Sequence, residues 1–532
     1  MRESNSEEQN VSRAAGVVGF FTFLSRILGL VRDVVLAFFF GTGMAMDAFV
    51  AAFRIPNLLR RLFAEGSLTI VFIPVFTEYL TKRTKKEAFE LARIILTLLA
   101  IILVVMTLLG ILFSPWLVRI QAYGFGGSGV KYDLTVLLTR ITFPYIFFIS
   151  IVALFMGILN SLRHFAAPAA APIFLNVGII GASYLISPHL TQPILGVAVG
   201  VLIGGILQVA LQIPWVLKEG FRLFPLWQLN HPALKKIALL MVPALFGSAV
   251  YQLNSYIGTL LASFLEEGSV SWLYYADRLV QFPLGVFAIA ISTAALPSFS
   301  TQAARKDFED LGNTLNHALG LVFFIIIPSI VGLIVLGGPI IQILFERGAF
   351  NAYSSGMINQ ALVMYAMGLW AFSGTRIIVS VFYAFQDTKT PVKVAVVTFL
   401  INLVLSLLLM GPLKHSGIAL ALSLASAIQF LLLIFILKKR FSIIRMGPAA
   451  VSAVKSLAAA SMMGVGVYYA YSNWLIIDST FGFWNMALNL IGLIIIGIFI
   501  YFIGALILRC RELVAIADII QSILRRNAPL RS

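Results

Sequence analysis

The sequence has few of the charged residues that cover the surface of a soluble protein. Only 11% of its 532 residues are charged and 60% are hydrophobic, against about 25% and about 45–50% in an ordinary soluble domain. Its single cysteine, Cys510, excludes an intrachain disulfide. Its five histidines fall in predicted loops or at predicted helix ends without the spacing of metal ligands. We therefore predict a membrane protein that holds neither a metal nor a cofactor.

Apolar runs recur along the whole chain, and many are long enough for the roughly 20-residue helix that a bilayer requires. The first ten residues are polar and acidic, so we expect no cleaved signal and a retained first helix. The fold class that follows is an all-α integral membrane protein of about 14 transmembrane helices. The predicted helices are 14–40, 45–80, 88–113, 134–159, 171–187, 194–216, 239–265, 270–299, 316–336, 358–385, 394–410, 416–437, 451–472 and 484–508.

The net charge of +16 is explained by its distribution along the chain. If the predicted segments alternate across the membrane from a cytoplasmic amino terminus, 24 Lys and Arg residues fall on the cytoplasmic side. Four fall outside: Arg119, Lys131, Arg347 and Lys414. Such a positive-inside bias predicts a multi-pass protein with both termini in the cytoplasm. It also makes a nucleic-acid partner unnecessary.

The chain matches itself at an offset near 221 to 226 residues. The run from Gly196 to Lys218 resembles the run from Gly417 to Lys439, including Gln208 and Gln429. We interpret this as a duplication that gives two pseudo-symmetric six-helix lobes around a central cavity. The predicted domains are 1–220 and 221–445 for the lobes, 446–510 for two appended helices, and 511–532 for a cytoplasmic amphipathic tail at the membrane surface.

Several ionisable residues fall inside predicted spans, where each costs roughly 2.5 kcal/mol or more unless it faces a cavity or a partner. Arginines outnumber carboxylates among them, which favours a phosphate or carboxylate ligand in a cationic cavity. A second interpretation is that they form ion pairs between helices or reach the cytoplasmic interface. The set is Arg26, Arg32, Asp33, Asp47, Arg54, Arg60, Arg61, Glu65, Asp277 and Arg278.

Longer motifs around these residues resemble one family. The stretches Ser25–Asp33, Gly43–Phe49, Pro56–Gly66, Gly268–Arg278 and Gln386–Lys393 resemble the lipid II flippase MurJ (MviN) family of the multidrug/oligosaccharidyl-lipid/polysaccharide exporter superfamily. The matches run in order along nearly the whole chain and are weakest in the last two helices. The resemblance implies a V-shaped pair of lobes around a cationic cavity, and a groove for an isoprenoid tail in the last two helices.

The resemblance also implies a function, a site and a location. A member of this family would move lipid II, the undecaprenyl-diphosphate-linked disaccharide-pentapeptide, from the cytoplasmic to the periplasmic leaflet of the bacterial inner membrane. Its partners would be lipid II, membrane lipids and other proteins of cell-wall synthesis. The diphosphate ligands would be Arg26, Arg32, Arg60 and Arg278. Supporting or gating roles would fall to Asp33, Asp47, Arg54, Arg61, Glu65 and Asp277.

Other functions remain open at this point. A related exporter would carry another polyprenyl-diphosphate-linked sugar, whereas a drug antiporter for cations should have a cavity rich in acids. An enzyme acting on lipid diphosphates would need paired catalytic carboxylates, a histidine nucleophile or a metal cluster, and the sequence shows none of these. A scaffold without transport activity would leave the intramembrane arginines without a purpose. We therefore predict a transporter and not an enzyme.

Overall fold

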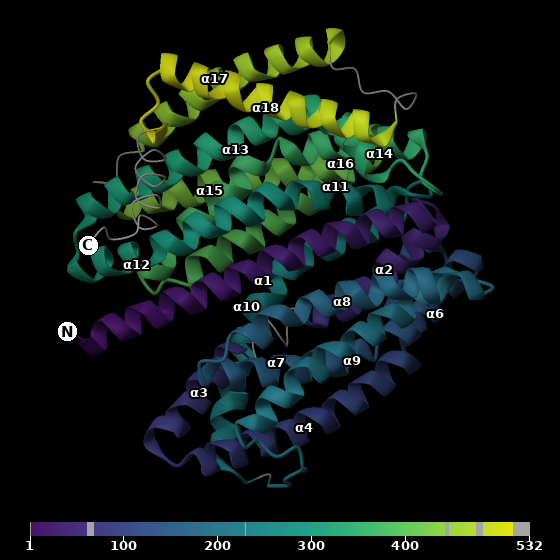
Figure 1. Cartoon of the computed structure of the whole chain (residues 1–532), viewed down its shortest axis with the longest axis vertical. Helices are drawn as coiled ribbons and strands as arrows, with labels where there is room; N and C mark the ends of the chain where they lie inside the picture. The colour runs from purple at the N-terminus through teal and green to yellow at the C-terminus, as the bar shows by residue number, and fades with distance from the viewer. Residues whose placement is uncertain (1, 61–68, 229, 442–445, 475–481, 514–532) are drawn as a thin grey trace, which may run out of the picture. The chain divides into compact units, whose positions relative to one another are not determined.

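The computed structural model describes residues 2–60, 69–228, 230–441, 446–474 and 482–513, and within these ranges every regular element is a helix (Figure 1). The chain divides into two compact units. Unit 1 is Met1–Ser271 with Arg347–Asn351, and unit 2 is Trp272–Glu346 with Ala352–Ser532. The α-helices of unit 1 are α1 (Arg2–Phe40), α2 (Met44–Arg60), α3 (Thr69–Lys82), α4 (Lys85–Leu112), α5 (Ser114–Gln121), α6 (Val130–Thr142), α7 (Tyr145–Ser161), α8 (Ala166–Leu185), α9 (Ile194–Lys218) and α10 (Pro232–Ala262).

Unit 2 begins at the first turn of α11, whose last residue, Pro283, is followed by a π-helical turn at Leu284–Ala288. Proline lacks an N–H donor, and π-turns often interrupt helices at functional sites. The helices of this unit are α11 (Ser269–Pro283), α12 (Ile289–Arg305), α13 (Phe308–Phe345), α14 (Ala352–Ala366), α15 (Leu369–Ala384), α16 (Lys389–Arg440), α17 (Gly447–Asn473) and α18 (Phe483–Ile507).

Small residues let the helices of unit 1 pack closely. Helices α8 and α9 pack along their lengths, and a Cβ added at Gly178 would lie only 2.6 Å from the backbone nitrogen of Gly204. Close backbone approach at small residues is typical of helix pairs in membranes.

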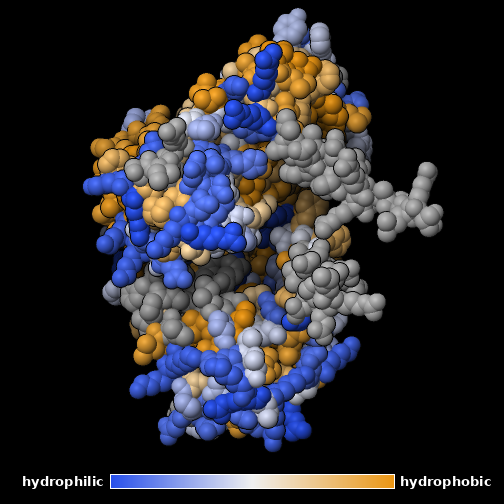
Figure 2. Space-filling model, turned by 90° about the vertical axis from the view of Figure 1, so that its left-hand side faces the viewer, coloured by the Kyte–Doolittle hydropathy of each residue, from blue (hydrophilic) through white to orange (hydrophobic). Residues whose placement is uncertain are grey.

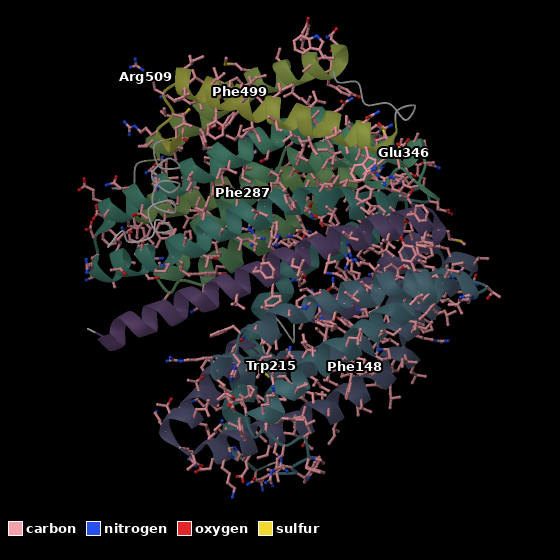
Figure 3. The ribbon with its side chains drawn as sticks, viewed as in Figure 1. Phe148, Trp215, Phe287, Glu346, Phe499 and Arg509 are labelled. Carbon is pink, nitrogen blue, oxygen red and sulfur yellow. The ribbon has the colours of Figure 1, made fainter. Side chains whose placement is uncertain are left out.

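In unit 2, Tyr501 on α18 donates to the carbonyl of Phe324 on α13 at 2.6 Å, which ties the last helix to its unit. Phe499 on the same helix is 67% exposed and is labelled in Figure 3.

Among the described residues, helices occupy at least part of each of the fourteen predicted ranges, but the predicted number of spans is not confirmed. In the described part of the chain nine helices are long and apolar enough to cross a membrane, or ten if the bent pair α14 and α15 forms one span. Two predicted helices, 394–410 and 416–437, form the single 52-residue run α16, about 78 Å long if straight. Lys414 breaks this run with a φ of 49° and a ψ of −132°. The predicted helix 45–80 is described only at its two ends, α2 and α3.

The two units share a local structure that supports the proposed duplication. Helices α7 and α15 end in the same turn, at Arg163 (φ 65°) and Gln386 (φ 57°), two positions 223 residues apart. The next amide, of His164 or Asp387, donates to the carbonyl five residues before it, at 2.8 and 2.9 Å. This left-handed turn with a long backbone hydrogen bond is the usual Schellman ending of a helix.

The residue after each turn then contacts a residue of opposite acid–base type at the end of a later helix of the same unit. His164 Nε2 lies 2.7 Å from Glu219 Oε1, beyond α9, and Asp387 Oδ2 lies 2.7 Å from Arg440 Nη1, at the end of α16. Glu219 and Arg440 are 221 residues apart, so the contact is repeated with the acidic and basic partners exchanged. Trp215 on α9, labelled in Figure 3, packs its ring 6.1 Å from that of His164. The predicted domain boundaries at 220, 445 and 510 remain predictions.

Candidate functional site

The first cluster in unit 1 surrounds Arg32 on α1. Its Nε and Nη2 donate to Asp33 Oδ1 at 3.0 and 2.7 Å, and its Nη1 donates to Asn176 Oδ1 at 3.2 Å. Asn176, on α8, donates in turn to the carbonyl of Ser25 at 3.2 Å. Arg32 and Asp33 are buried, at 9% and 2% exposure. A buried guanidinium needs such a partner to offset its desolvation, and here it also joins α1 to α8.

The second cluster surrounds Asp47 in the first turn of α2, which is 1% exposed. Its Oδ2 accepts from Lys131 Nζ and from the backbone N of Gly268, both at 2.8 Å. Its Oδ1 accepts from the backbone N and the Oγ of Ser271, at 2.9 and 2.6 Å. The first backbone N–H groups of a helix have no partner within the helix and carry partial positive charge. A carboxylate from α2 therefore caps the start of α11.

The start of α2 is capped in turn by an acid from the segment before α11. Glu267, in the loop before α11, accepts from the backbone N of Met44 at 2.8 Å. Each of these two helices therefore has its first turn capped by an acid from the other segment. Residues 347–351 reach the same end of unit 1, where the amide of Ala349 donates to the carbonyl of Phe38 at 2.9 Å. Gly41 takes a φ of 59°, and a Cβ there would collide with the carbonyl of Ala349.

The other predicted residues of unit 1 lie half-buried on α1 and α2. Arg54 hydrogen-bonds to Thr259 on α10, and Arg60 Nε donates to Asn57 Oδ1 one turn earlier at 2.9 Å. Arg26 is half-buried on α1. Two further predicted positions, Arg61 and Glu65, lie outside the described residues.

In unit 2 the predicted residues Asp277 and Arg278 lie on α11. The guanidinium of Arg278 lies over the ring of Tyr274, 4.8 Å from its centroid, and its Nη2 donates to the Tyr274 hydroxyl at 3.3 Å. Asp277 accepts a hydrogen bond from Gln281 on the next turn. The aromatic face attracts the cation and holds its planar group in one orientation.

Sequence reasoning missed several partners of these residues. Lys131 was predicted as a charge of an external loop, yet it lies at the start of α6 and pairs with Asp47. Asn176 and Ser271 carry no charge, so nothing in the local sequence marks them as partners. Arg376 was also missed, although a half-buried arginine in the middle of the apolar helix α15 follows the same rule that identified the others.

These clusters fix helix ends, and their guanidinium groups have the chemistry that pairs with anions. Among the described residues no three His, Cys, Asp or Glu side chains lie close enough to hold a metal ion. Guanidinium groups on α1, α2 and α11 are suited to bidentate recognition of phosphate or carboxylate. The acids Asp33 and Asp47 are occupied by contacts within the protein.

Comparison with known proteins identifies the family of the chain. Residues 36–488 match the family model described as "Lipid II flippase MurJ". The chain belongs to the lipid II flippase MurJ family. It is 39% identical over 424 residues to the probable lipid II flippase MurJ of Vibrio cholerae, covering 78% of this chain and 81% of that one. It is 38% identical over 435 residues to the lipid II flippase MurJ of Burkholderia cenocepacia, covering 81% and 84%.

Solved structures place the chain in the MurJ fold. A lipid II flippase MurJ in an inward closed conformation matches with a TM-score of 0.78 and 29% identity, covering 93% of this chain and 99% of that one. An inward-facing multidrug MATE transporter of the MOP superfamily matches with a TM-score of 0.67 at 13% identity, covering 81% and 98%, which shows a shared fold alone. The chain is thus a multi-pass, all-helical membrane protein of a transporter family and not an enzyme.

Proposed function

We propose that this protein moves lipid II from the cytoplasmic to the periplasmic leaflet of the bacterial inner membrane by alternating access, for cell-wall synthesis. The observation that supports this most is the family match over residues 36–488, together with 99% coverage of a solved MurJ chain. Both termini lie in the cytoplasm in this proposal, as the positive-inside distribution predicts. Lipid II is the proposed partner, and other proteins of cell-wall synthesis would supply and consume it.

The proposed binding site uses the guanidinium groups of Arg26, Arg32, Arg60 and Arg278 for the diphosphate. A diphosphate carries about two negative charges and offers several acceptor oxygens, so charge-assisted bonds of about 1.5–3 kcal/mol each would hold it. Arg278 has an orientation already set by Tyr274. Arg32 would have to exchange its bonds to Asp33 for bonds to the substrate, so the acid would release the guanidinium as the ligand arrives.

The supporting residues fall into two proposed roles. Asp47 would act as a gate residue, because its four hydrogen bonds fix the first turn of α11 to α2 and α6. Asp33 would orient Arg32, and Asp277 would orient the neighbouring Arg278 on α11. Arg54 would hold α2 against α10 through Thr259. Arg61 and Glu65, outside the described residues, keep their proposed supporting role.

Complementation in a bacterium depleted of its own lipid II flippase tests the substrate. Expression of this chain should restore growth and reduce the lipid II that accumulates on the cytoplasmic leaflet. The control is the Asp133→Ala variant, which removes an exposed aspartate from α6 and should complement as well as the wild type does. If lipid II stays on the cytoplasmic leaflet while the folded protein is present in the membrane, the assignment of lipid II is wrong. Export of a different polyprenyl-diphosphate sugar in the same cells would point to a related exporter.

A further inference from the structure

A pocket of about 420 Å³ lies between the end of α3 and the start of α10 in unit 1. Its charged lining residues are Glu78, Lys82, Arg83 and Lys236, and Tyr79 forms part of its wall. The positive-inside pattern assigns this end of unit 1 to the cytoplasmic side. Figure 2 views the molecule from the side on which α3 ends in Figure 1, and hydrophilic residues gather there.

The pocket has more positive than negative charge. Among the described residues that line it, Glu78 is the only acid, and both of its oxygens are occupied: Oε1 by Lys82 Nζ at 3.2 Å and Oε2 by Lys236 Nζ at 2.7 Å. Arg83 contacts Glu87, outside the pocket, at 3.1 Å. The side chains of Lys82, Arg83 and Lys236 are 72%, 55% and 53% exposed, so their remaining donors are accessible. One carboxylate shared by two ammonium groups leaves the site cationic.

Exposed apolar side chains on α10 and in the segment before it fit a position of the pocket at the membrane surface. Leu239, one turn beyond Lys236 on α10, is 68% exposed, and Phe224 and Trp227 in the segment before α10 are 74% and 63% exposed. This segment is held against α4, because Arg93 Nε donates to the Phe224 carbonyl at 2.9 Å. Exposed aromatic residues are enriched at the level of lipid headgroups. The cationic pocket is therefore next to surface that suits acyl chains.

We propose that this pocket binds the phosphodiester group of an acidic phospholipid in the cytoplasmic leaflet. The phosphate would lie among Lys82, Arg83 and Lys236, and the acyl chains would lie along the exposed apolar surface near Leu239. Basic residues near an anionic leaflet attract its lipids, and a pocket adds shape to that attraction. A free phosphate would meet the same basic residues but gains nothing from the apolar surface. The site is separate from the intramembrane arginines, so it does not depend on the proposed flippase function.

The test measures lipid binding to the full-length protein in detergent by native mass spectrometry, with phosphatidylglycerol as the probe. Each basic residue near a lipid headgroup contributes about fivefold in affinity, so the triple variant Lys82→Gln/Arg83→Gln/Lys236→Gln should bind about a hundredfold more weakly. The matched control is Lys389→Gln/Lys393→Gln/Lys439→Gln, which removes three exposed lysines from unit 2. It should change binding less than twofold.

A second variant keeps the proposal testable if the triple variant folds poorly. Glu78→Gln removes the one acid of the pocket, so phosphatidylglycerol should bind about fivefold more tightly. Lys82→Arg/Lys236→Arg keeps both charges and should bind as the wild type does. Equal loss in the triple variant and its control, or no gain with Glu78→Gln, would overturn the site. Binding of inorganic phosphate without phosphatidylglycerol, or equal binding of phosphatidylcholine, would overturn the assignment to an acidic lipid.

Discussion

Asp47 and Ser271 are joined by two hydrogen bonds to a single carboxylate oxygen: Asp47 Oδ1 accepts from the backbone N of Ser271 at 2.9 Å and from its Oγ at 2.6 Å. The two residues are 224 positions apart in the chain. Because the other oxygen binds Lys131 and Gly268, one buried acid holds the starts of α2, α6 and α11 together. These four hydrogen bonds explain why a buried aspartate is tolerated at this position.

Replacing Asp47 with alanine should lower the free energy of unfolding, because it removes the contact between the first turns of α2 and α11. The change leaves the Lys131 ammonium and two backbone N–H groups without their acceptor, which costs about 3–5 kcal/mol for a buried ion pair. We expect a lower unfolding temperature in detergent. In a Cys510→Ser background, a cysteine at the buried Ser269 should also react faster with an impermeant thiol reagent added outside.

The matched control for this change is Asp133→Ala, which removes an exposed aspartate from α6. It should alter neither the unfolding temperature nor the labelling rate. Ser271→Ala should have an intermediate effect, since it loses the Oγ contact and keeps the backbone one, at a cost of about 1.5–3 kcal/mol. Unchanged labelling of Ser269→Cys in the Asp47→Ala protein would contradict a gating role for this contact.

Arg32 and Asp33 allow helix packing and ligand binding to be separated. Asp33→Ala leaves a buried guanidinium without its carboxylate and should lower the unfolding temperature, whereas the double variant Arg32→Ala/Asp33→Ala should recover most of that loss. If Arg32 binds the diphosphate, the double variant is stable but does not flip lipid II. If transport recovers with stability, the pair serves only to join α1 to α8, and Arg32 is not a substrate ligand.

The sequence predicts the positions of the helices better than it predicts the contacts between their side chains. Long apolar runs predict the helices well, because a bilayer allows no other backbone arrangement without closing a barrel. They did not reveal the break of the predicted helix 134–159 at Phe143 and Pro144, between α6 and α7. The charges Arg32 and Asp47 were identified because ionisable residues are costly in lipid. Their partners Asn176 and Ser271 lie 144 and 224 residues away, and no local pattern encodes such a distance.

The ion contacts of Glu219 give a pH dependence outside the membrane spans. The hydrogen bond from Lys85, and then that from His164, lower the pKa of the Glu219 carboxyl below its usual range. A lowered folded-state pKa stabilises the protein above the ordinary carboxyl pKa of about 4.3 and loses that effect as the pH falls through the lowered value. Glu219→Gln should therefore be less stable than the wild type at pH 7, by about 1 kcal/mol or less. The difference in unfolding temperature should vanish in acid, and a difference that persists there would contradict this origin.

If the two turns are equivalent, the residues at the turn of unit 2 should be tolerated at the corresponding positions of unit 1. Glu219→Arg alone places a cation beside Lys85 and His164 and should destabilise unit 1. The triple variant Lys85→Phe/His164→Asp/Glu219→Arg copies Phe308, Asp387 and Arg440, which occupy the corresponding places in unit 2. It should regain most of the unfolding temperature lost by Glu219→Arg. A triple variant as unstable as the single one would show that the two turns are not equivalent.

Flipping of lipid II by the purified protein in liposomes tests the central claim most directly. Labelled lipid II is placed in the inner leaflet, and its arrival outside is followed with an impermeant reagent that reacts only with exposed lipid. The wild-type protein should expose lipid II, and folded Arg278→Ala should expose it at least tenfold more slowly, since it loses a contact of about 1.5–3 kcal/mol. Arg278→Lys should recover part of the rate, because it keeps the charge and loses the planar group. Lipid II that stays inside with the wild-type protein, or wild-type flipping by folded Arg278→Ala, would contradict the account.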